Sequence, residues 1–216
     1  MNKVIQFGEQ VEGYSIPVLN EREIRAAAGM LFLLMFTSVM TVVLTENFLL
    51  LKYAVTIFFA DILIRVFISP RYAPTLILGR LIVRNQVPEY VGAQQKKVAW
   101  IIGVVLAAIF FSLTVLVNSY SPITGIICFI CLIFLFFEAA FGICLGCKFY
   151  SMVYKEKAQY CPGEVCTPET KQAIQKTSMS QILIVFGFIA FVVVISVLFN
   201  DYFSVQPFDL LGIDKQ

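Results

Sequence analysis

Residues 26–44 of the chain read AAAGMLFLLMFTSVMTVVL, an apolar run without a charged side chain. Its length is close to the roughly 20 residues that a helix needs to cross the hydrocarbon core of a bilayer. Similar apolar runs cover residues 48–68, 98–117, 123–154 and 181–199. Only 14% of the residues are charged, whereas an average soluble domain is about a quarter charged. The sequence therefore predicts an all-α integral membrane protein, a bundle of about five transmembrane helices.

These runs also divide the chain into segments. We expect a cytoplasmic N-terminal segment at 1–25, a four-span membrane core at 26–154, a cytoplasmic cysteine-containing loop at 155–180, a fifth transmembrane helix at 181–199 and a short outer tail at 200–216. Within the core, Pro70 and Pro74 interrupt the chain, and the stretch 75–84 places Arg80 and Arg84 four residues apart. This spacing predicts a short helix that lies in the membrane interface.

Two helix ends can be placed from the pattern. Asn20 with Glu23 three residues later forms a capping-box pattern, which predicts that the first helix begins there. The apolar run 123–154 is longer than the hydrocarbon core is thick, at about 1.5 Å of rise per residue. We therefore expect one long helix whose last turns protrude from the membrane and carry Cys144 and Cys147.

Lysine and arginine are distributed unevenly between the two sides, and their excess marks the cytoplasmic side of a membrane protein. They precede span one, and they separate spans two and three and spans four and five: Lys3, Arg22, Arg25, Arg71, Arg80, Arg84, Lys96, Lys97, Lys155, Lys157, Lys171 and Lys176. The loops at 45–47 and 118–122 contain none. With five spans, the pattern predicts a cytoplasmic N-terminus and an outer C-terminus.

The composition removes several classes of function. The chain contains no histidine, which excludes Ser-His-Asp and Cys-His arrangements and zinc sites with imidazole ligands. Its formal net charge is +2, and its basic residues form no stripe with interleaved aromatic residues, so nucleic acid is not an expected partner. Membrane lipid is. The helices show no clear internal repeat of the kind found in transporters, so transport ranks last among the functions considered.

Six cysteines remain, in three close pairs: Cys128 with Cys131, Cys144 with Cys147, and Cys161 with Cys166. The first pair lies among Ile, Phe and Leu, where a thiol usually behaves as a small buried apolar group. The second pair falls about 20 residues after the outer end of its span, so we expect it at the cytoplasmic interface. A Cys-x-x-Cys pair supports thiol-disulfide exchange, and its spacing also suits two ligands of a tetrahedral metal.

The third pair follows in the polar segment, where Pro162-Gly163 is a turn signal that would fold Cys161 and Cys166 toward each other. Four sulfurs could then converge at one cytoplasmic site. Two interpretations stay open. The pair Cys144 and Cys147 could carry thiol-redox or sulfur-transfer chemistry, or the four cysteines could hold zinc or an iron-sulfur centre without turnover. A structural disulfide is disfavoured on a reducing cytoplasmic face.

Ionisable residues inside a bilayer are costly and therefore informative. Asp61 and Arg65 lie four apart, a spacing that lets them pair and hold the bundle together. Glu138 precedes Cys144 by about one and a half turns; we expect it to line a cavity near the thiols and to hold a proton there. Lys52 lies near the outer end of span two, where its amine can extend to the interface.

Three stretches together resemble a bacterial membrane-protein family known as domain of unknown function 4395. They are PVLNEREIRA at 17–26, SPRYAP at 69–74 with Arg80 and Arg84, and FEAAFGICLGC at 137–147. The resemblance covers roughly residues 10–155 and implies a four-helix core in which Cys144 and Cys147 are the functional candidates. Span five and the loop with Cys161 and Cys166 go beyond that pattern, and the resemblance implies no particular reaction.

Taken together, these observations predict a multi-pass protein of the bacterial cytoplasmic (inner) membrane. We expect a thiol-redox or sulfur-transfer function that resembles that of a thiol-disulfide oxidoreductase, with Cys144 and Cys147 as the reacting pair. The expected partner is a thioredoxin-like or sulfur-carrier protein.

Overall fold

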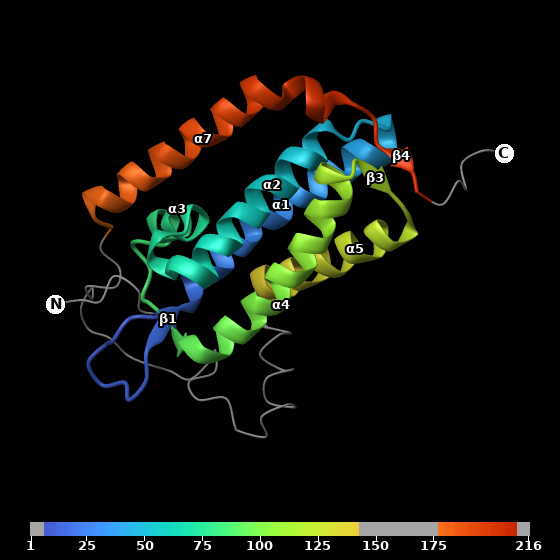
Figure 1. The fold of residues 1–216 in the computed structure, drawn as a ribbon. Coiled ribbons are helices and arrows are strands. Elements are labelled where there is room, and N and C mark those ends of the chain that lie inside the picture. The colour runs from blue at the N-terminus through green and yellow to red at the C-terminus, as the bar shows by residue number, and fades with distance from the viewer. Residues whose placement is uncertain (1–6, 143–176, 211–216) are drawn as a thin grey trace.

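The computed structural model describes residues 7–142 and 177–210, and most of their regular structure is helical. In chain order the elements are β1 (Val18–Asn20), α1 (Glu21–Thr45), α2 (Leu49–Leu63), η1 (Ile64–Ile68), η2 (Pro70–Tyr72), α3 (Pro74–Ile82), β2 (Tyr90–Gly92), α4 (Ala93–Phe111), η3 (Ser112–Leu116), β3 (Ser119–Tyr120), α5 (Pro122–Phe136), η4 (Phe137–Phe141), α7 (Met179–Ser204) and β4 (Phe208–Asp209). Long helices run side by side, with β1 at one end of the bundle and β4 at the other (Figure 1). The all-α membrane bundle is confirmed.

Among the described residues, four helices are long and apolar enough to cross a membrane: α1, α4 with its continuation η3, α5 with its continuation η4, and α7. The second expected span, α2 with η1, is different because it carries three ionisable side chains, Lys52, Asp61 and Arg65. All three are buried inside the protein. This helix therefore hides its charges from lipid by packing against α1 and α4.

Small residues set how closely the helices approach. Ala27 and Ala28 of α1 are buried where this helix meets α3 and its neighbours. Gly79 of α3 lies directly on the first turn of α1, since a Cβ atom added to it would stand 2.5 Å from the carbonyl oxygen of Glu23. Helices in membranes commonly use small residues for such contacts. The α1–α3 crossing places Glu23 of α1 beside Arg80 of α3.

The short helix expected near residues 75–84 exists, but its orientation differs from the expectation. Leu78, Leu81 and Ile82 of α3 are exposed, whereas Arg80 is only 6% exposed and points into the protein. Arg84 lies beyond the end of the helix and is exposed. The expectation that Arg80 and Arg84 lie on one face of this helix was wrong, because two carboxylates of neighbouring elements bind Arg80 inside the bundle.

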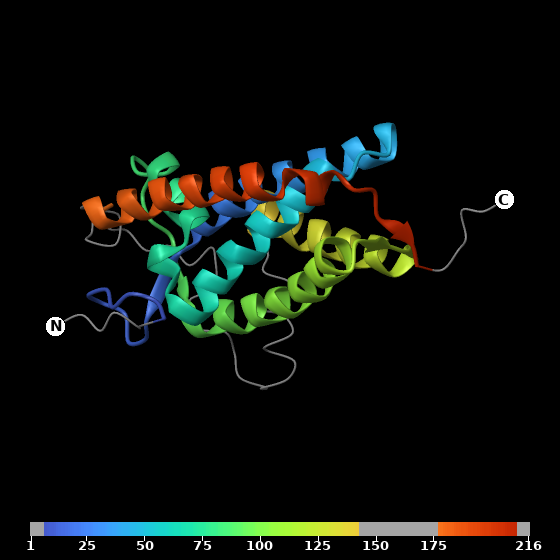
Figure 2. The same cartoon turned by 45° about the horizontal axis from the view of Figure 1, so that its top comes forward.

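Short strands close both ends of the bundle. β1 and β2 pair antiparallel, with Asn20 opposite Tyr90, and β3 and β4 pair in parallel, with Ser119 opposite Phe208. The peripheral helix α7 runs along the outside of the bundle and passes α3 and α2 (Figure 2). Its first turn is fixed by Gln181, whose side-chain amide donates to the carbonyl of Arg71 at 3.0 Å.

Lys52 fixes the other end of α7. Its amine donates to the carbonyl of Phe203 at 3.0 Å and to that of Val205. The last carbonyls of a helix have no partner within the helix and carry partial negative charge, so an ammonium group suits them. The expected extension of Lys52 to the membrane interface was wrong: the residue is 2% exposed and its partners are protein carbonyls.

Candidate functional site at the β1 end of the bundle

Asp61 and Arg65 form the ion pair that their spacing predicts. The guanidinium Nε of Arg65 lies 2.7 Å from Oδ2 of Asp61, and both residues are buried. The structure adds Thr75, whose hydroxyl donates to Asp61 at 2.7 Å and accepts from Arg65 at 2.6 Å. The backbone amide of Thr75 also donates to Asp61 at 2.9 Å. Asp61 therefore caps the start of α3 from a neighbouring helix, where an anion is favoured.

A second cluster joins α1, α4 and η4. The amine of Lys96 lies 2.8 Å from Oε2 of Glu21 and 2.9 Å from Oε1 of Glu138. Lys96 and Glu21 are almost fully buried, and the Glu138 side chain is 14% exposed. Glu138 does line a cleft, but its carboxylate is ion-paired. One amine therefore binds two carboxyl groups here.

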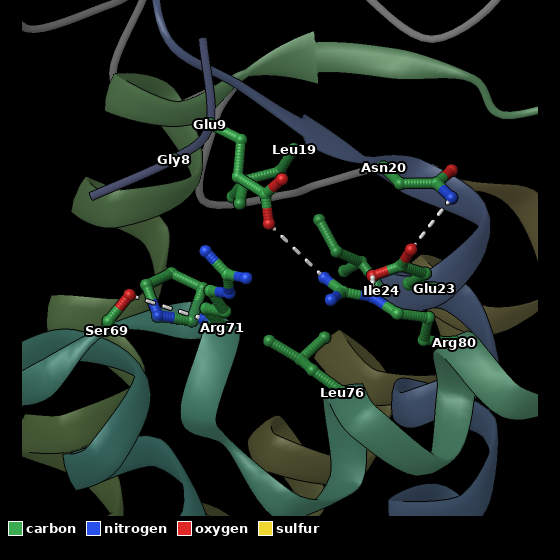
Figure 3. Close-up of a pocket in the computed structure, with 11 residues that line it drawn as sticks. Gly8, Glu9, Leu19, Asn20, Glu23, Ile24, Ser69, Arg71, Leu76 and Arg80 are labelled. Atoms are coloured by element: carbon green, nitrogen blue, oxygen red, sulfur yellow. Dashed lines mark hydrogen bonds and ion pairs between the residues drawn. The ribbon is translucent and has the colours of Figure 1, made fainter. Parts of the chain in front are cut away.

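A third cluster joins α1, α3 and the segment before β1. Arg80 binds Glu23 at 3.1 Å and Glu9 at 3.5 Å, and Asn20 donates to Glu23 at 3.1 Å (Figure 3). These groups line a cleft into which Arg71 also points. Burial raises the pKa of Glu9, and the opposite charges of Arg80 and Arg71 lower it in part.

The predicted helix start at Asn20 is confirmed, although the bonds differ from those of a capping box. The Asn20 side chain accepts from the amide of Arg22 at 3.2 Å. Glu23 does not return to the Asn20 backbone amide; its carboxylate binds the Asn20 side chain and Arg80. Glu23, which its spacing from Asn20 assigned to helix capping, therefore forms an ion pair with Arg80, which is distant in sequence.

The end of η4 is held by Arg25 of α1. Its guanidinium donates to the carbonyl of Ala139 at 3.4 Å and to that of Ala140 at 3.1 Å. Gly142 follows in the left-handed conformation, with φ 66°, and ends the helix. The expectation of one continuous helix through residues 123–154 was wrong at this point, because Gly142 adopts a conformation that a helix cannot continue.

The cysteines divide between two parts of the chain. Cys128 and Cys131 are buried and free on α5, as expected for apolar core positions. The predicted site residues Cys144, Cys147, Cys161 and Cys166 lie outside the described residues. Within residues 7–142 and 177–210, no three His, Cys, Asp or Glu side chains are placed to hold a metal ion. The zinc or iron-sulfur site expected at those four cysteines stays a prediction.

Sequence reasoning missed five of the residues that build these clusters: Glu9, Glu21, Arg25, Thr75 and Lys96. Arg25 and Lys96 entered the argument only as markers of orientation. A signal was present, since each charge adjoins an apolar run on the same predicted side of the membrane. Charged side chains that are buried at the same depth of a helix bundle need partners of opposite charge at that depth.

Residues 19–155 match the family described as Domain of unknown function (DUF4395). The chain belongs to this family. The match starts in β1 and extends past η4. It therefore includes the Asp61–Arg65 pair, the Lys96 cluster and the Glu23–Arg80 pair, and it also includes the positions of Cys144 and Cys147. It leaves out Cys161, Cys166 and α7. No curated protein and no solved structure matches the chain.

Proposed function

We propose that this chain is a membrane thiol-redox or sulfur-transfer protein whose reacting groups are Cys144 and Cys147. The observation that supports this most is the anchoring of the chain just before these cysteines. Arg25 binds the carbonyls of Ala139 and Ala140, and Lys96 binds Glu138. Residues that present a reactive group work best when a rigid shell fixes the elements that carry them.

The charge at this position also favours thiol chemistry. The Arg25 guanidinium lies beside Gly142, two residues before Cys144, because a Cβ atom added to Gly142 would stand 3.4 Å from Nη1 of Arg25. Cationic groups near a cysteine favour the thiolate, which is the nucleophile in thiol-disulfide exchange. Lys148, the closest cation on the C-terminal side, would act in the same sense.

The proposed reaction needs a partner protein that carries a disulfide, such as a thioredoxin-like protein. One thiolate of the pair attacks a partner sulfur, the partner disulfide breaks, and a mixed disulfide forms while one partner thiolate leaves. The second cysteine then attacks the mixed disulfide and releases the partner as a dithiol. Two electrons pass from the cysteine pair to the partner, and Cys144 and Cys147 end as a disulfide. With a sulfur-carrier protein that bears a persulfide, the same thiolate would attack the outer sulfur of that persulfide. The carrier's S–S bond breaks, the carrier leaves as a thiolate, and the cysteine of this chain holds the sulfur as a persulfide.

The spacing of the cysteines favours one alternative, a membrane protein that binds zinc or an iron-sulfur centre through Cys144, Cys147, Cys161 and Cys166 without turnover. Elemental analysis and a free-thiol count on the purified chain separate the two proposals. We expect no stoichiometric metal and a thiol count that falls by two on mild oxidation. One equivalent of zinc, or iron with sulfide, that shields all four thiols from modification would support the alternative.

We further propose that the protein lies in the bacterial inner membrane with its N-terminus in the cytoplasm. The support is the distribution of basic residues, because apart from Lys52 the described lysines and arginines lie toward the β1 end of the bundle. Such an excess marks the cytoplasmic side. Cys144 would then lie on the reducing side of the membrane, where a dithiol persists.

A further inference from the structure

A groove lies between α1, α2, α4 with η3, and α5, at the end of the bundle opposite β1. Its own space is about 390 Å³. An apolar cavity of about 150 Å³ is already large enough to bind benzene, so this groove has room for a longer hydrocarbon. Its lining begins beside the loops at 45–47 and 118–121, which connect the helices at this end. In the proposed orientation, the groove lies in the outer half of the membrane.

The groove opens toward lipid between α1 and α5. Val43 of α1 and Phe129 of α5 line it and are 68% and 64% exposed. The lining residues behind them are buried and include Leu51, Phe110 and Cys128. Both α1 and α5 with η4 are long and apolar enough to cross a membrane. The opening between them therefore faces the hydrocarbon core of the bilayer.

The serine and threonine hydroxyls in the lining are already bonded within the protein. The hydroxyl of Thr114 donates to the carbonyl of Phe110 at 2.7 Å, and that of Thr124 donates to the carbonyl of Ser121 at 2.6 Å. The Ser121 hydroxyl accepts from the Thr124 amide at 3.4 Å. Among the described residues, no charged side chain lines the groove. An apolar chain therefore matches these walls better than a charged or strongly polar group does.

The size of the groove distinguishes between two apolar occupants. A helix of a second copy of this chain is about 10–12 Å across with its side chains, which is too wide for a groove of this volume. An acyl chain is slender and flexible. In the groove it gains van der Waals contacts with walls on several sides, whereas on a flat helix surface it contacts the protein on one side only.

We propose that this groove binds one acyl chain of a membrane phospholipid. The chain enters between α1 and α5, and the head group stays at the membrane surface beside the loops at 45–47 and 118–121. Ligand sites are typically concave and mostly apolar, with volumes of about 300–1,000 Å³, and the groove fits this description. The proposal does not depend on the chemistry of Cys144 and Cys147.

The test is titration of the delipidated full chain with dioleoylphosphatidylcholine in detergent micelles, followed by native mass spectrometry. We expect one lipid to bind saturably before any weaker binding. Gly125→Phe should weaken this first binding about 10-fold or more, because the ring takes the space of the chain and removes its contacts. Gly125 lines the groove, and a Cβ atom added there meets nothing within 4 Å, so the variant should melt at the wild-type temperature.

The matched control is Gly187→Phe on α7, an exposed glycine outside the groove where an added Cβ atom also meets nothing within 4 Å. This variant should bind the lipid as the wild type does. Excess hexadecane should displace the lipid, whereas glycerophosphocholine, the head group alone, should not. Equal binding in all three proteins, or displacement by glycerophosphocholine, would overturn the proposal. A wild-type dimer that Gly125→Phe converts to a monomer would assign the groove to a second copy and would also overturn it.

Discussion

Lys96 holds three helical elements together at the β1 end. It joins Glu21 at the start of α1 to Glu138 in η4 and is itself in the first turns of α4. Removing one member of a buried charge cluster leaves the others without compensation, which typically costs more than the pairing gains. The structural importance of this lysine is invisible in the sequence, where Lys96 and Lys97 look equivalent.

This difference gives a direct comparison. Lys96→Met should lower the free energy of unfolding by about 3–5 kcal/mol, because two carboxylates lose their shared cation. Lys97→Met should have a much smaller effect, since Lys97 is half-buried and its amine lies over the Phe7 ring at 5.3 Å. Thermal unfolding in detergent would measure both variants. Equal loss in the two would contradict the assigned role of Lys96.

Asp61 and Arg65 show what local spacing can reveal. Their pairing was predictable from a separation of four residues on one helix, whereas Thr75 comes from a different element and could not be inferred from spacing. The same holds for Arg80, whose carboxylate partners lie far away in sequence. Short-range pairs are encoded in helical periodicity; partners across helices depend on packing that periodicity does not determine.

A double-mutant cycle tests the Asp61 pair. Asp61→Ala and Arg65→Ala should each destabilise the protein strongly, because each leaves the other charge buried and unpaired. The double variant should lose less than the two single losses combined, with a coupling of about 0.5–3 kcal/mol. Chemical denaturation of the wild type, the two single variants and the double variant measures their free energies of unfolding. Losses that simply add would rule out the direct interaction.

At the level of elements, most span boundaries were predictable because a bilayer imposes length and apolarity on each helix. The end of the fourth helix was not, because the apolar run continues past Gly142 while the backbone turns left-handed there. The short helix α3 was expected in the interface, but it packs against α1, most closely at Gly79, and joins it through the Arg80–Glu23 ion pair.

Gly79→Ala adds only one methyl group, but we expect it to disturb the packing of α3 against α1. The new methyl group would stand 2.5 Å from the Glu23 carbonyl oxygen, so α3 must move away from α1 and pull Arg80 from its partners. We expect a loss of about 1–3 kcal/mol, as for overpacked sites. Gly187→Ala, which meets open space, should be neutral or slightly stabilising. A Gly79→Ala protein with unchanged melting temperature would contradict the close helix contact.

For the whole molecule, the arrangement of the helices places the charged clusters at one end and the β3–β4 pairing at the other (Figure 1). The proposed orientation follows if the charged end faces the cytoplasm. Single cysteines introduced in a cysteine-free background at Val87 and Glu46, which are exposed at opposite ends, test it. In intact cells a membrane-impermeant thiol reagent should label the Glu46→Cys protein and spare the Val87→Cys protein. The reverse pattern would invert the topology and remove the argument for a reducing compartment.

The most direct measurement of the central proposal is capture of a partner by single-cysteine variants of the Cys144 and Cys147 pair. With the resolving sulfur removed, either Cys144→Ser or Cys147→Ser should accumulate a mixed disulfide with a partner protein, seen by non-reducing electrophoresis and mass spectrometry and lost on reduction. Cys128→Ser and Cys131→Ser should trap nothing, because both thiols are buried in the bundle. Wild-type protein that carries stoichiometric metal, together with Cys144→Ser and Cys147→Ser proteins that lose the metal and never trap a partner, would contradict the thiol-redox proposal.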